Sequence, residues 1–269
     1  MKKAKKQPTS NHHIRPYGWK HDSPDKRDLH YKPKDETLKK LPKKVDLRAG
    51  CPKVYDQGSL SSCTANAIAA AIEFELLKQN KKYDFMPSRL FIYYNERVIE
   101  KSVNVDEGAE IRNGIKSVNK QGVCRESMWK YEINKTRFKT KPSAACYKEA
   151  LDHKSISYHR VDKKLKLMKA CLAEGYPFVF GFLVYTKFEE LKIWKSGVLN
   201  MPGPKEKLKG AHAVLCVGYD DDTKTVLVRN SWGKSWGQKG YFTMPYQYLT
   251  KGKLSDDFWT IRWMELSSK

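Results

Sequence analysis

The first half of the chain follows a helical pattern of apolar residues. After Cys63, apolar side chains recur at the spacing of one helix face, with good helix formers between them, at Ile68, Ala69, Ile72 and Leu76. Two more helical patterns cover residues 87–100, behind a proline and a serine, and residues 110–122, up to a glycine. The stretch from residue 63 to about 150 therefore predicts a mainly helical region.

The second half follows a strand pattern. Beyond about residue 155, short runs rich in β-branched and aromatic residues alternate with Gly, Asp and Lys turns, at residues 178–185, 212–220, 225–232, 240–246 and 258–263. The two patterns together predict an α+β fold with an N-terminal helical lobe at about 45–150. An antiparallel, barrel-like β lobe would follow at about 151–269, with a ligand-binding cleft between the lobes.

Residues 1–44 precede both patterns and are rich in Lys, His, Pro and Asp. We interpret them as a basic, extended N-terminal arm, followed at Val45 by the folded domain of residues 45–269. The arm carries apolar residues suited to anchoring it on another surface, namely Ile14, Tyr17, Trp19, Leu29 and Tyr31. Two interpretations stay open: the arm occludes the cleft, or it is a mobile basic tail.

Charge narrows the possible partners and compartments. The chain has 52 Lys and Arg against 30 Asp and Glu, a formal charge of +22 at pH 7. This excess indicates either an anionic partner such as nucleic acid or a lysine-rich solvated surface. The sequence shows neither the apolar segment of a secretory signal nor a membrane-spanning run. We expect a monomer with no membrane association that is cytoplasmic, packaged in a virion, or exported by a route other than Sec.

The cysteines do not follow a disulfide or zinc pattern. No C-x-x-C pair occurs among the six, which are Cys51, Cys63, Cys124, Cys146, Cys171 and Cys216. We expect mostly reduced thiols and neither a metal nor a cofactor. If any pair forms a disulfide, Cys124 and Cys146 are the best placed, because they bracket one polar loop.

Cys63 differs from the other cysteines because it begins a predicted helix. Ser61 or Ser62 can cap the first turn, which would leave the sulfur at the positive end of the helix dipole. That position favours a thiolate and makes Cys63 a candidate nucleophile. Most isolated cysteines are simply small buried apolar residues, so the proposal needs a base elsewhere in the chain.

His212 and Asn230 supply the missing groups. His212 begins a predicted strand, and Asn230 lies near the end of the next one, in the string NSWGKSWGQKGY at residues 230–241. A thiolate, an imidazole and an amide that orients the imidazole form the Cys-His-Asn version of a catalytic triad.

With these residues the chain resembles the papain-like cysteine peptidases, over both lobes and most specifically in N-S-W-G-x-x-W-G-x-x-G-Y. The resemblance implies that Gln57, six residues before Cys63, donates to the oxyanion, and that Trp232 shields the Asn230–His212 hydrogen bond from water. Around the nucleophile the chain departs from the family, with Leu60 in place of a disulfide cysteine and Thr64 in place of an aromatic residue. The short N-terminal arm is closest to the prodomain-less members of bacteria and large viruses.

The resemblance also implies a substrate-binding set. It places Gly108 and Ala109 in a strip that pairs with substrate backbone, and it adds Trp232 to the substrate-binding residues. The P2 side chain is the second before the scissile bond, and the resemblance lines its pocket with Ile111, Gly181, Gly210 and Ala213. Small uncharged walls predict a hydrophobic P2 residue, whereas Asp256 or Asp257 on the pocket floor would favour a basic one.

The function that follows is a thiol endopeptidase working through an acyl-enzyme, held as a zymogen if the arm autoinhibits it. The alternatives are a catalytically silent papain-like peptide-binding protein and a basic packaging protein. A Cys-His acyltransferase of the transglutaminase type is disfavoured, because those enzymes use an aspartate where this chain has Asn230.

Overall fold

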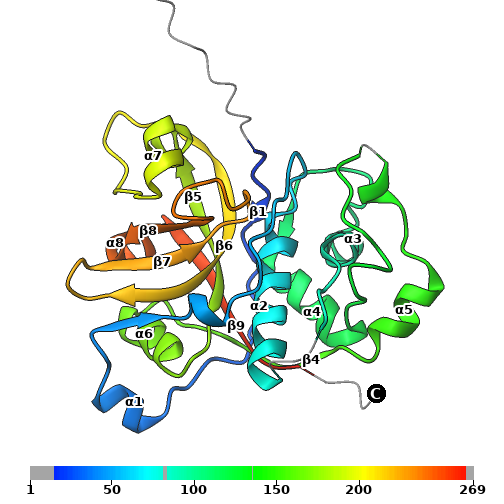
Figure 1. The fold of residues 1–269 in the computed structure, drawn as a ribbon, viewed down its shortest axis with the longest axis horizontal. Helices are drawn as coiled ribbons and strands as arrows, with labels where there is room; N and C mark the ends of the chain where they lie inside the picture. The colour runs from blue at the N-terminus through cyan, green and yellow to red at the C-terminus, as the bar shows by residue number, and fades with distance from the viewer. Residues whose placement is uncertain (1–14, 81–83, 135, 265–269) are drawn as a thin grey trace, which may run out of the picture.

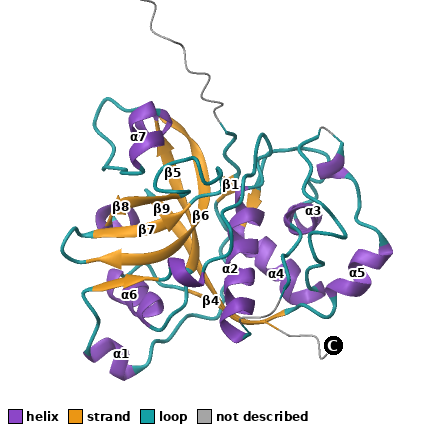
Figure 2. Cartoon of the chain, in the orientation of Figure 1, coloured by secondary structure: helices purple, strands orange, loops and turns teal. Residues whose placement is uncertain are grey.

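The computed structural model describes residues 15–80, 84–134 and 136–264. Helix α2 (Cys63–Gln79) stands between a helical lobe and a β lobe, and the arm passes along the junction (Figure 1). Strands gather on one side of α2, while α3 (Arg89–Ile99), α4 (Ile111–Gln121) and α5 (Ala144–Ala150) lie on the other (Figure 2). This is the two-lobed α+β arrangement that the sequence predicts.

Local sequence explains where the helices of the first lobe begin and end. The Ser88 side chain accepts a hydrogen bond from the backbone N–H of Phe91 at 3.1 Å and so caps α3. Gly122 ends α4 with φ of 78°, a conformation that glycine adopts at little cost. Helix α2 is buried on nearly all sides and rich in alanine, which lets β6 and the neighbouring helices approach it closely.

The β lobe is one mixed-length antiparallel sheet. Its strand order is β4-β9-β5-β6-β7-β8, with bounds β4 (Ser155–Arg160), β9 (Ser255–Met264), β5 (Phe178–Tyr185), β6 (Leu208–Asp220), β7 (Thr225–Arg229) and β8 (Tyr241–Pro245). Within the described residues the two end strands, β4 and β8, do not pair, so the predicted barrel-like sheet stays open. Three short helices flank it, α6 (Leu165–Ala173), α7 (Leu191–Ser196) and α8 (Tyr246–Thr250).

The arm is ordered over its described part. Strand β1 (Trp19–Lys20) pairs with β3 (Ala109–Glu110), α1 (Asp35–Lys39) packs against α6, and β2 (Lys44–Asp46) pairs with β6. The sequence placed the residues from about 45 in the helical lobe. Strand β2 instead joins the sheet, so residues 44–46 belong to the β lobe. Of the predicted anchors, Trp19 and Tyr31 are buried, Leu29 is 66% exposed, and Ile14 lies outside the described residues.

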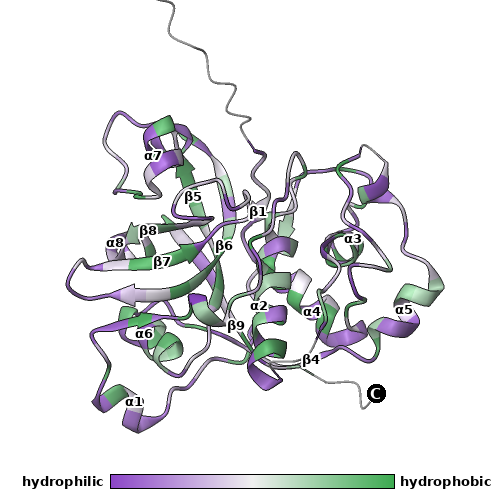
Figure 3. Ribbon diagram, in the orientation of Figure 1, coloured by the Kyte–Doolittle hydropathy of each residue, from purple (hydrophilic) through white to green (hydrophobic). Residues whose placement is uncertain are grey.

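The core forms on both faces of the sheet. One cluster joins α2, α3 and α4 to the inner face, and the other fills the outer face beneath α6, α7 and α8. Figure 3 shows the central strands β5 and β6 coloured as hydrophobic, while the peripheral loops are hydrophilic. Because α2 packs directly on β6, the N-terminus of the helix meets the residues that begin the buried part of the strand.

Candidate active site

The sulfur of Cys63 lies at the junction of the lobes, at the first residue of α2. The side chain is fully buried, and Sγ accepts a hydrogen bond from the backbone N–H of Ala213 at 3.3 Å. Neither predicted serine caps the helix: the Ser62 side chain makes no capping hydrogen bond, and Ser61 Oγ donates to the Asp106 carbonyl instead.

Burial disfavours ionisation of the Cys63 thiol in this conformation. Burial raises the pKa of Cys63 to about 12, and hydrogen bonds from the backbone N–H groups of Ala213 and Gly18 offset only part of the increase. Burial of the sulfur therefore acts against the thiolate that the helix position predicts, and the charge of Cys63 stays a prediction.

His212 and Asn230 come together on adjacent strands. His212 lies on β6, and Asn230 follows β7, the strand that pairs with β6. Nε2 of the imidazole is 2.8 Å from Asn230 Oδ1, which also accepts the N–H of Ser231 at 2.9 Å. Because this oxygen is an acceptor, Nε2 carries the proton, and a neutral imidazole presents a bare Nδ1. Within the described residues Nδ1 has no hydrogen-bond partner.

Aromatic rings surround the imidazole. Ring centroids of Trp232, Phe182 and Tyr17 lie 5.3, 5.8 and 5.9 Å from that of His212. Burial lowers the pKa of His212 to about 4, against the smaller opposing effect of the Asn230 hydrogen bond. Burial thus disfavours the charged forms of both the thiol and the imidazole, and the sulfur contacts the backbone N–H of Ala213, the residue after His212.

Gln57 presents its side-chain amide to the same cleft. Its Oε1 accepts from the Ser231 hydroxyl at 2.7 Å, so Nε2 points the other way and donates to the Leu60 carbonyl at 2.9 Å and to the Pro16 carbonyl at 3.1 Å. The amide is fully buried and held on both sides. A pre-oriented N–H donor of this kind is what an oxyanion in the cleft requires.

Residues 15–20, which we call the cleft segment, run along this site. The Gly18 carbonyl accepts the N–H of Ala109 at 2.9 Å, and β1 lies parallel to β3. A Cβ on Gly18 would overlap the carbonyl of Ser61, and one on Gly108 would overlap the backbone of Gly18. Glycine at positions 18 and 108 therefore lets the backbone of the cleft segment contact the backbones at Ser61 and Gly108.

The side chains on either side of Gly18 fill two separate pockets. Trp19 packs on Gly181, and its Nε1 donates to Asp257 Oδ2 at 3.1 Å. Tyr17 packs on Gly210, where a Cβ would lie 2.7 Å from the ring, and its ring centroid is 6.1 Å from that of Trp232. The arm thus covers the cleft on both sides of the sulfur.

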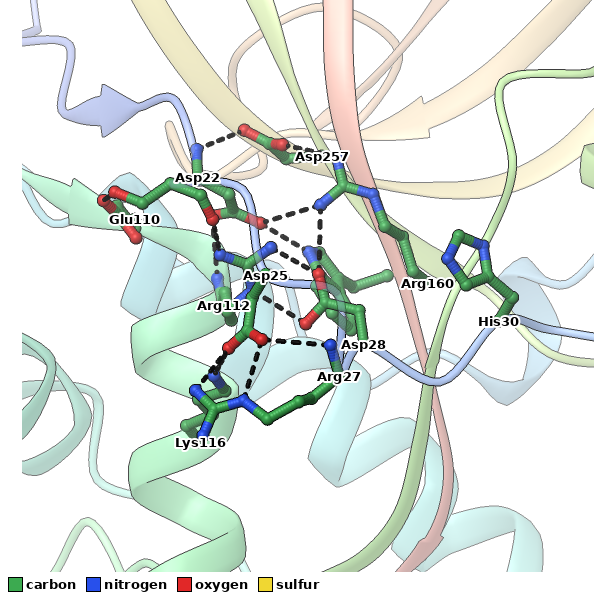
Figure 4. A network of polar contacts seen from close by, with 12 residues as sticks. Asp22, Asp25, Arg27, Asp28, His30, Glu110, Arg112, Lys116, Arg160 and Asp257 are labelled. Atoms are coloured by element: carbon green, nitrogen blue, oxygen red, sulfur yellow. Dashed lines mark hydrogen bonds and ion pairs between the residues drawn. The ribbon is translucent and has the colours of Figure 1, made fainter.

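A second attachment follows, made by residues 22–28, which we call the acidic segment. Its aspartates converge on basic side chains of α4 and β4 (Figure 4). Arg112 Nε donates to Asp28 at 3.0 Å, and the backbone N–H of Arg112 donates to Asp22 at 3.0 Å. Lys116 pairs with Asp25 at 3.0 Å.

Asp22 and Asp257 form the buried centre of this network. The backbone N–H of Asp22 donates to Asp257 Oδ2 at 2.8 Å, and the Trp259 indole donates to Asp22 Oδ2 at 2.7 Å. Arg160 lies 2.9 Å from Asp257 and 3.6 Å from Asp22. Burial raises the pKa of Asp22 to about 7, with the charge of Asp257 adding to it, and burial also raises the pKa of Asp257.

Comparison with known families decides the identity. The sequence model of the family described as papain family cysteine protease matches residues 41–256. The chain belongs to this family. It is 42% identical over 272 residues to an uncharacterized peptidase C1-like protein of Acanthamoeba polyphaga mimivirus, covering 92% of this chain and 87% of the relative.

Solved structures of papain-family proteases have the same fold. Xylellain, a cysteine protease from Xylella fastidiosa, superposes with a TM-score of 0.86 at 45% identity, covering 94% of this chain and 96% of that one. Bromelain from Ananas comosus superposes with a TM-score of 0.61 at 20% identity, covering 84% and 100%, a likeness of fold alone. The protein is a papain-family cysteine protease, and its substrates are polypeptides.

The residues predicted for this papain-family site do not all lie in one pocket. Gly108 and Ala109 lie against Gly18, and Ala213 contacts the sulfur of Cys63. Gly181 and Gly210, assigned to a single pocket from the sequence, face different residues of the cleft segment. Ile111 begins α4 and is buried in the core cluster that also contains Trp19.

Some residues of the papain-family site were missed. Ser231 fixes the Gln57 amide, and Glu189 accepts from the Tyr17 hydroxyl at 3.0 Å. The serine stands inside the NSWG string beside Asn230, which was a signal that it lies near the site. Glu189 carries no local signal, because it meets the arm only through the fold.

Other expected features of this papain-family chain concern metals, membranes and disulfides. No group of three or more potential metal-ligating side chains occurs in the described part of the chain. Among the same residues, no helix has the length and apolar character needed to span a bilayer. All six cysteines lie within the described ranges and are free thiols.

Proposed function

We propose that the protein is a cysteine-type endopeptidase in which Cys63 is the nucleophile, His212 transfers protons and Asn230 orients the imidazole. The observation that carries the proposal is a peptide carbonyl already seated in the site. Pro16 O accepts from Gln57 Nε2 at 3.1 Å, in the cleft that also holds the sulfur. A substrate carbonyl in that position would meet the nucleophile and an oxyanion donor together.

Acylation begins with proton transfer from the thiol to Nδ1 of His212, while Asn230 holds the Nε2 proton. The sulfur attacks the carbonyl carbon, and the electron pair of the C=O bond moves to the oxygen. Gln57 Nε2 and the backbone N–H of Cys63 donate to this oxyanion, and one such donor contributes about 3 kcal/mol to transition-state stabilisation. The imidazolium then protonates the leaving nitrogen, the C–N bond breaks, and a thioester remains.

Deacylation reverses the roles of these groups. His212 takes a proton from water, the water oxygen attacks the thioester carbon, and the C–S bond breaks. The sulfur recovers its proton from the imidazolium, and the products are a carboxylic acid and an amine. Atoms and protons balance with the peptide and one water molecule.

We also propose that residues 1–44 act as an autoinhibitory arm on the peptidase domain of residues 45–269, which makes the full chain a zymogen. The cleft segment blocks access, and it also removes water from the reacting groups. With the pKa of Cys63 at about 12 and that of His212 at about 4, the proton stays on sulfur and the nucleophile is not formed. Opening the arm returns water to the site and restores the ion pair.

The pocket that holds Trp19 is the proposed P2 pocket. Ala109 pairs with backbone on one side, Gly181 forms the base, and Asp257 accepts a hydrogen bond at the far end. Because Arg160 already pairs with Asp257, the pocket favours a large side chain with a neutral N–H or O–H donor over a second cation. A large P2 side chain with a neutral donor is intermediate between the hydrophobic and the basic P2 residues that the sequence left open.

The test uses the full-length chain with Gly18→Ala, which cannot seat the arm because its Cβ would overlap the Ser61 carbonyl. An epoxysuccinyl probe should label Cys63, and a fluorogenic peptide should be cleaved, with no cleavage by the Gly18→Ala, Cys63→Ala double variant. Labelling of Cys63 without cleavage of any peptide in a diverse library would favour a catalytically silent peptide-binding protein. Labelling of Cys124 or Cys216 in its place would refute the assignment.

A further inference from the structure

Tyr17 occupies a pocket next to the imidazole, opposite to the pocket of Trp19. Its ring lies over Gly210 of β6, and its centroid is 5.9 Å from that of His212 and 6.1 Å from that of Trp232. In the proposed reaction His212 protonates the leaving nitrogen, so the residue after the scissile bond must lie beside this imidazole. The Tyr17 pocket is therefore on the leaving-group side of the cleft.

Glu189 closes this pocket. It ends the 3₁₀ helix η3 (Thr186–Glu189), and its Oε1 accepts from the Tyr17 hydroxyl at 3.0 Å. The other oxygen, Oε2, lies 3.3 Å from Lys209 Nζ, and the Glu189 side chain is only 14% exposed. One carboxylate oxygen is thus paired with a cation, and the other accepts a neutral hydroxyl.

The pocket is built independently of the arm. Phe188, next to Glu189, is buried in the outer core, where its ring centroid lies 5.2 Å from that of Trp232 and 5.5 Å from that of Trp236. The start of η3 is tied to Glu206, which accepts the N–H of Lys187 at 3.3 Å and pairs with its ammonium at 3.1 Å. These contacts hold Glu189 in place whether the pocket contains Tyr17 or a substrate side chain.

We propose that Glu189 is a specificity residue that selects tyrosine at the first position after the scissile bond. The inference rests on the proposed peptidase function and names part of its substrate class. The aromatic walls suit a ring, and Oε1 accepts the hydroxyl that phenylalanine lacks. A lysine or arginine gains less, because Lys209 already neutralises the carboxylate and repels a second cation.

Tyr17 of the arm shows which side chain the pocket accepts, although we expect a substrate backbone to run in the opposite direction to that of the arm. Substrate backbone is expected to pair with the Gly108–Ala109 strip, to which β1 runs parallel. Reversing the chain moves the Cα atom, but the ring of a tyrosine still enters between the same walls and reaches the same carboxylate. A long aromatic side chain tolerates such a shift better than a short hydroxyl side chain would.

The experiment measures kcat/KM of the full-length Gly18→Ala chain on three peptides that differ only after the scissile bond, with Tyr, Phe or Lys there. We expect Tyr to exceed Phe by about tenfold, the size typical of a partly buried hydrogen bond to a charged group. Glu189→Leu, which removes the acceptor, should bring the Tyr-to-Phe ratio close to one. Glu189→Gln, which keeps an acceptor oxygen, should restore part of the ratio.

Glu190→Gln is the matched control, because Glu190 is the exposed neighbour of Glu189 and loses the same charge. It should leave the Tyr-to-Phe ratio unchanged. A ratio near one in the parent chain, or a ratio that survives Glu189→Leu, would overturn the proposal, as would a preference for Lys. Cleavage of all three peptides at equal rates refutes only this inference, whereas cleavage of none refutes the proposed function.

Discussion

The cleft segment and the acidic segment are neighbours in sequence, yet different interactions hold them. Residues 15–20 bind through backbone pairing with β3, a buried indole and a carbonyl on the Gln57 amide. Residues 22–28 bind through carboxylates that meet Arg112, Lys116 and Arg160 (Figure 4). In the proposed zymogen, the cleft segment would exclude substrate directly, while the acidic segment would only keep the cleft segment in place.

This difference predicts different responses to solution conditions. Apolar and backbone contacts change little with pH or salt, whereas buried ion pairs are sensitive to protonation and costly to break. The cleft segment should therefore set how completely the closed enzyme is inhibited. The acidic segment should set the conditions under which it opens.

The largest effect is expected in the cleft segment. Gly18→Ala should raise the rate of Cys63 labelling by about a hundredfold or more, because its Cβ would overlap the backbone of Ser61 and the closed state becomes inaccessible. The control is Gly203→Ala, since the nearest atom to a Cβ there is 3.6 Å away. Equal labelling of the native and Gly18→Ala chains would show that the arm does not guard the cleft.

Replacement of Arg112 should have the next largest effect on the rate of Cys63 labelling. Its guanidinium pairs with Asp28, and the two side chains are only 4% and 6% exposed. Breaking a buried pair costs 3–5 kcal/mol, part of which is recovered when the acidic segment undocks, so Arg112→Gln should speed labelling by about thirtyfold, or ~2 kcal/mol. Arg27→Gln, whose side chain is 87% exposed, should change the rate little. Equal effects of the two variants would contradict a buried anchor.

We expect docking of the arm to depend on pH through the carboxyl groups of Asp22 and Asp257. Docking raises the pKa of Asp22 from its ordinary 3.8 to about 7, chiefly by burial. A group whose pKa is raised on docking favours the docked state when protonated, so this contribution is complete below about pH 4 and is lost as pH rises through 7. The arm should therefore open toward neutral and alkaline pH.

Dividing the labelling rate of the native chain by that of Asp22→Asn at each pH removes the ionisation of the thiol itself. This ratio should rise by at least about tenfold between pH 5 and pH 8. Hydrogen bonds from Arg27, in the same segment, and from Lys116 of α4 lower the pKa of Asp25. Only the Lys116 bond depends on docking, and its contribution, opposite in sense to that of Asp22, weakens as the pH falls below about 4. A flat or falling ratio would exclude the carboxyl pair as the source.

The smallest effect on the rate of Cys63 labelling is expected at Lys116, which lies at the surface of the ion-pair network around the acidic segment. Lys116 pairs with Asp25 at 3.0 Å, and its side chain is 36% exposed. Such a pair contributes 0–1 kcal/mol, so Lys116→Gln should raise the labelling rate by about twofold, and 1 M salt should remove the difference. A larger effect that persists in salt would place Lys116 among the buried anchors.

Local patterns in the sequence predicted much of the fold and the candidate triad. The apolar spacing after Cys63 marks α2, and alternating runs mark β5 to β9. Contacts between distant segments left no such pattern: Asp22 meets Arg112 and Asp257 only in the folded chain. Leu29 was misjudged for the same reason, since its exposure depends on how the acidic segment docks.

The protonation of the site was also beyond sequence reasoning. The helix N-terminus favours a thiolate at Cys63, whereas burial raises the pKa of this thiol, and burial is decided by tertiary packing. Glu189 was invisible because a glutamate between a phenylalanine and another glutamate resembles any polar turn. The anionic partner suggested by the net charge stays a prediction.

The covalent link between the arm and β2 makes closure a unimolecular event. Residues 32–43 join the docked arm to the strand that begins at Lys44, so an arm that inhibits as we propose would always be present at an effective concentration of about millimolar. Dilution would then not open the proposed zymogen, and a free peptide would have to compete with the arm at that concentration. One cut within residues 32–43 would turn closure into a bimolecular equilibrium, after which simple dilution disperses the arm and activation becomes irreversible.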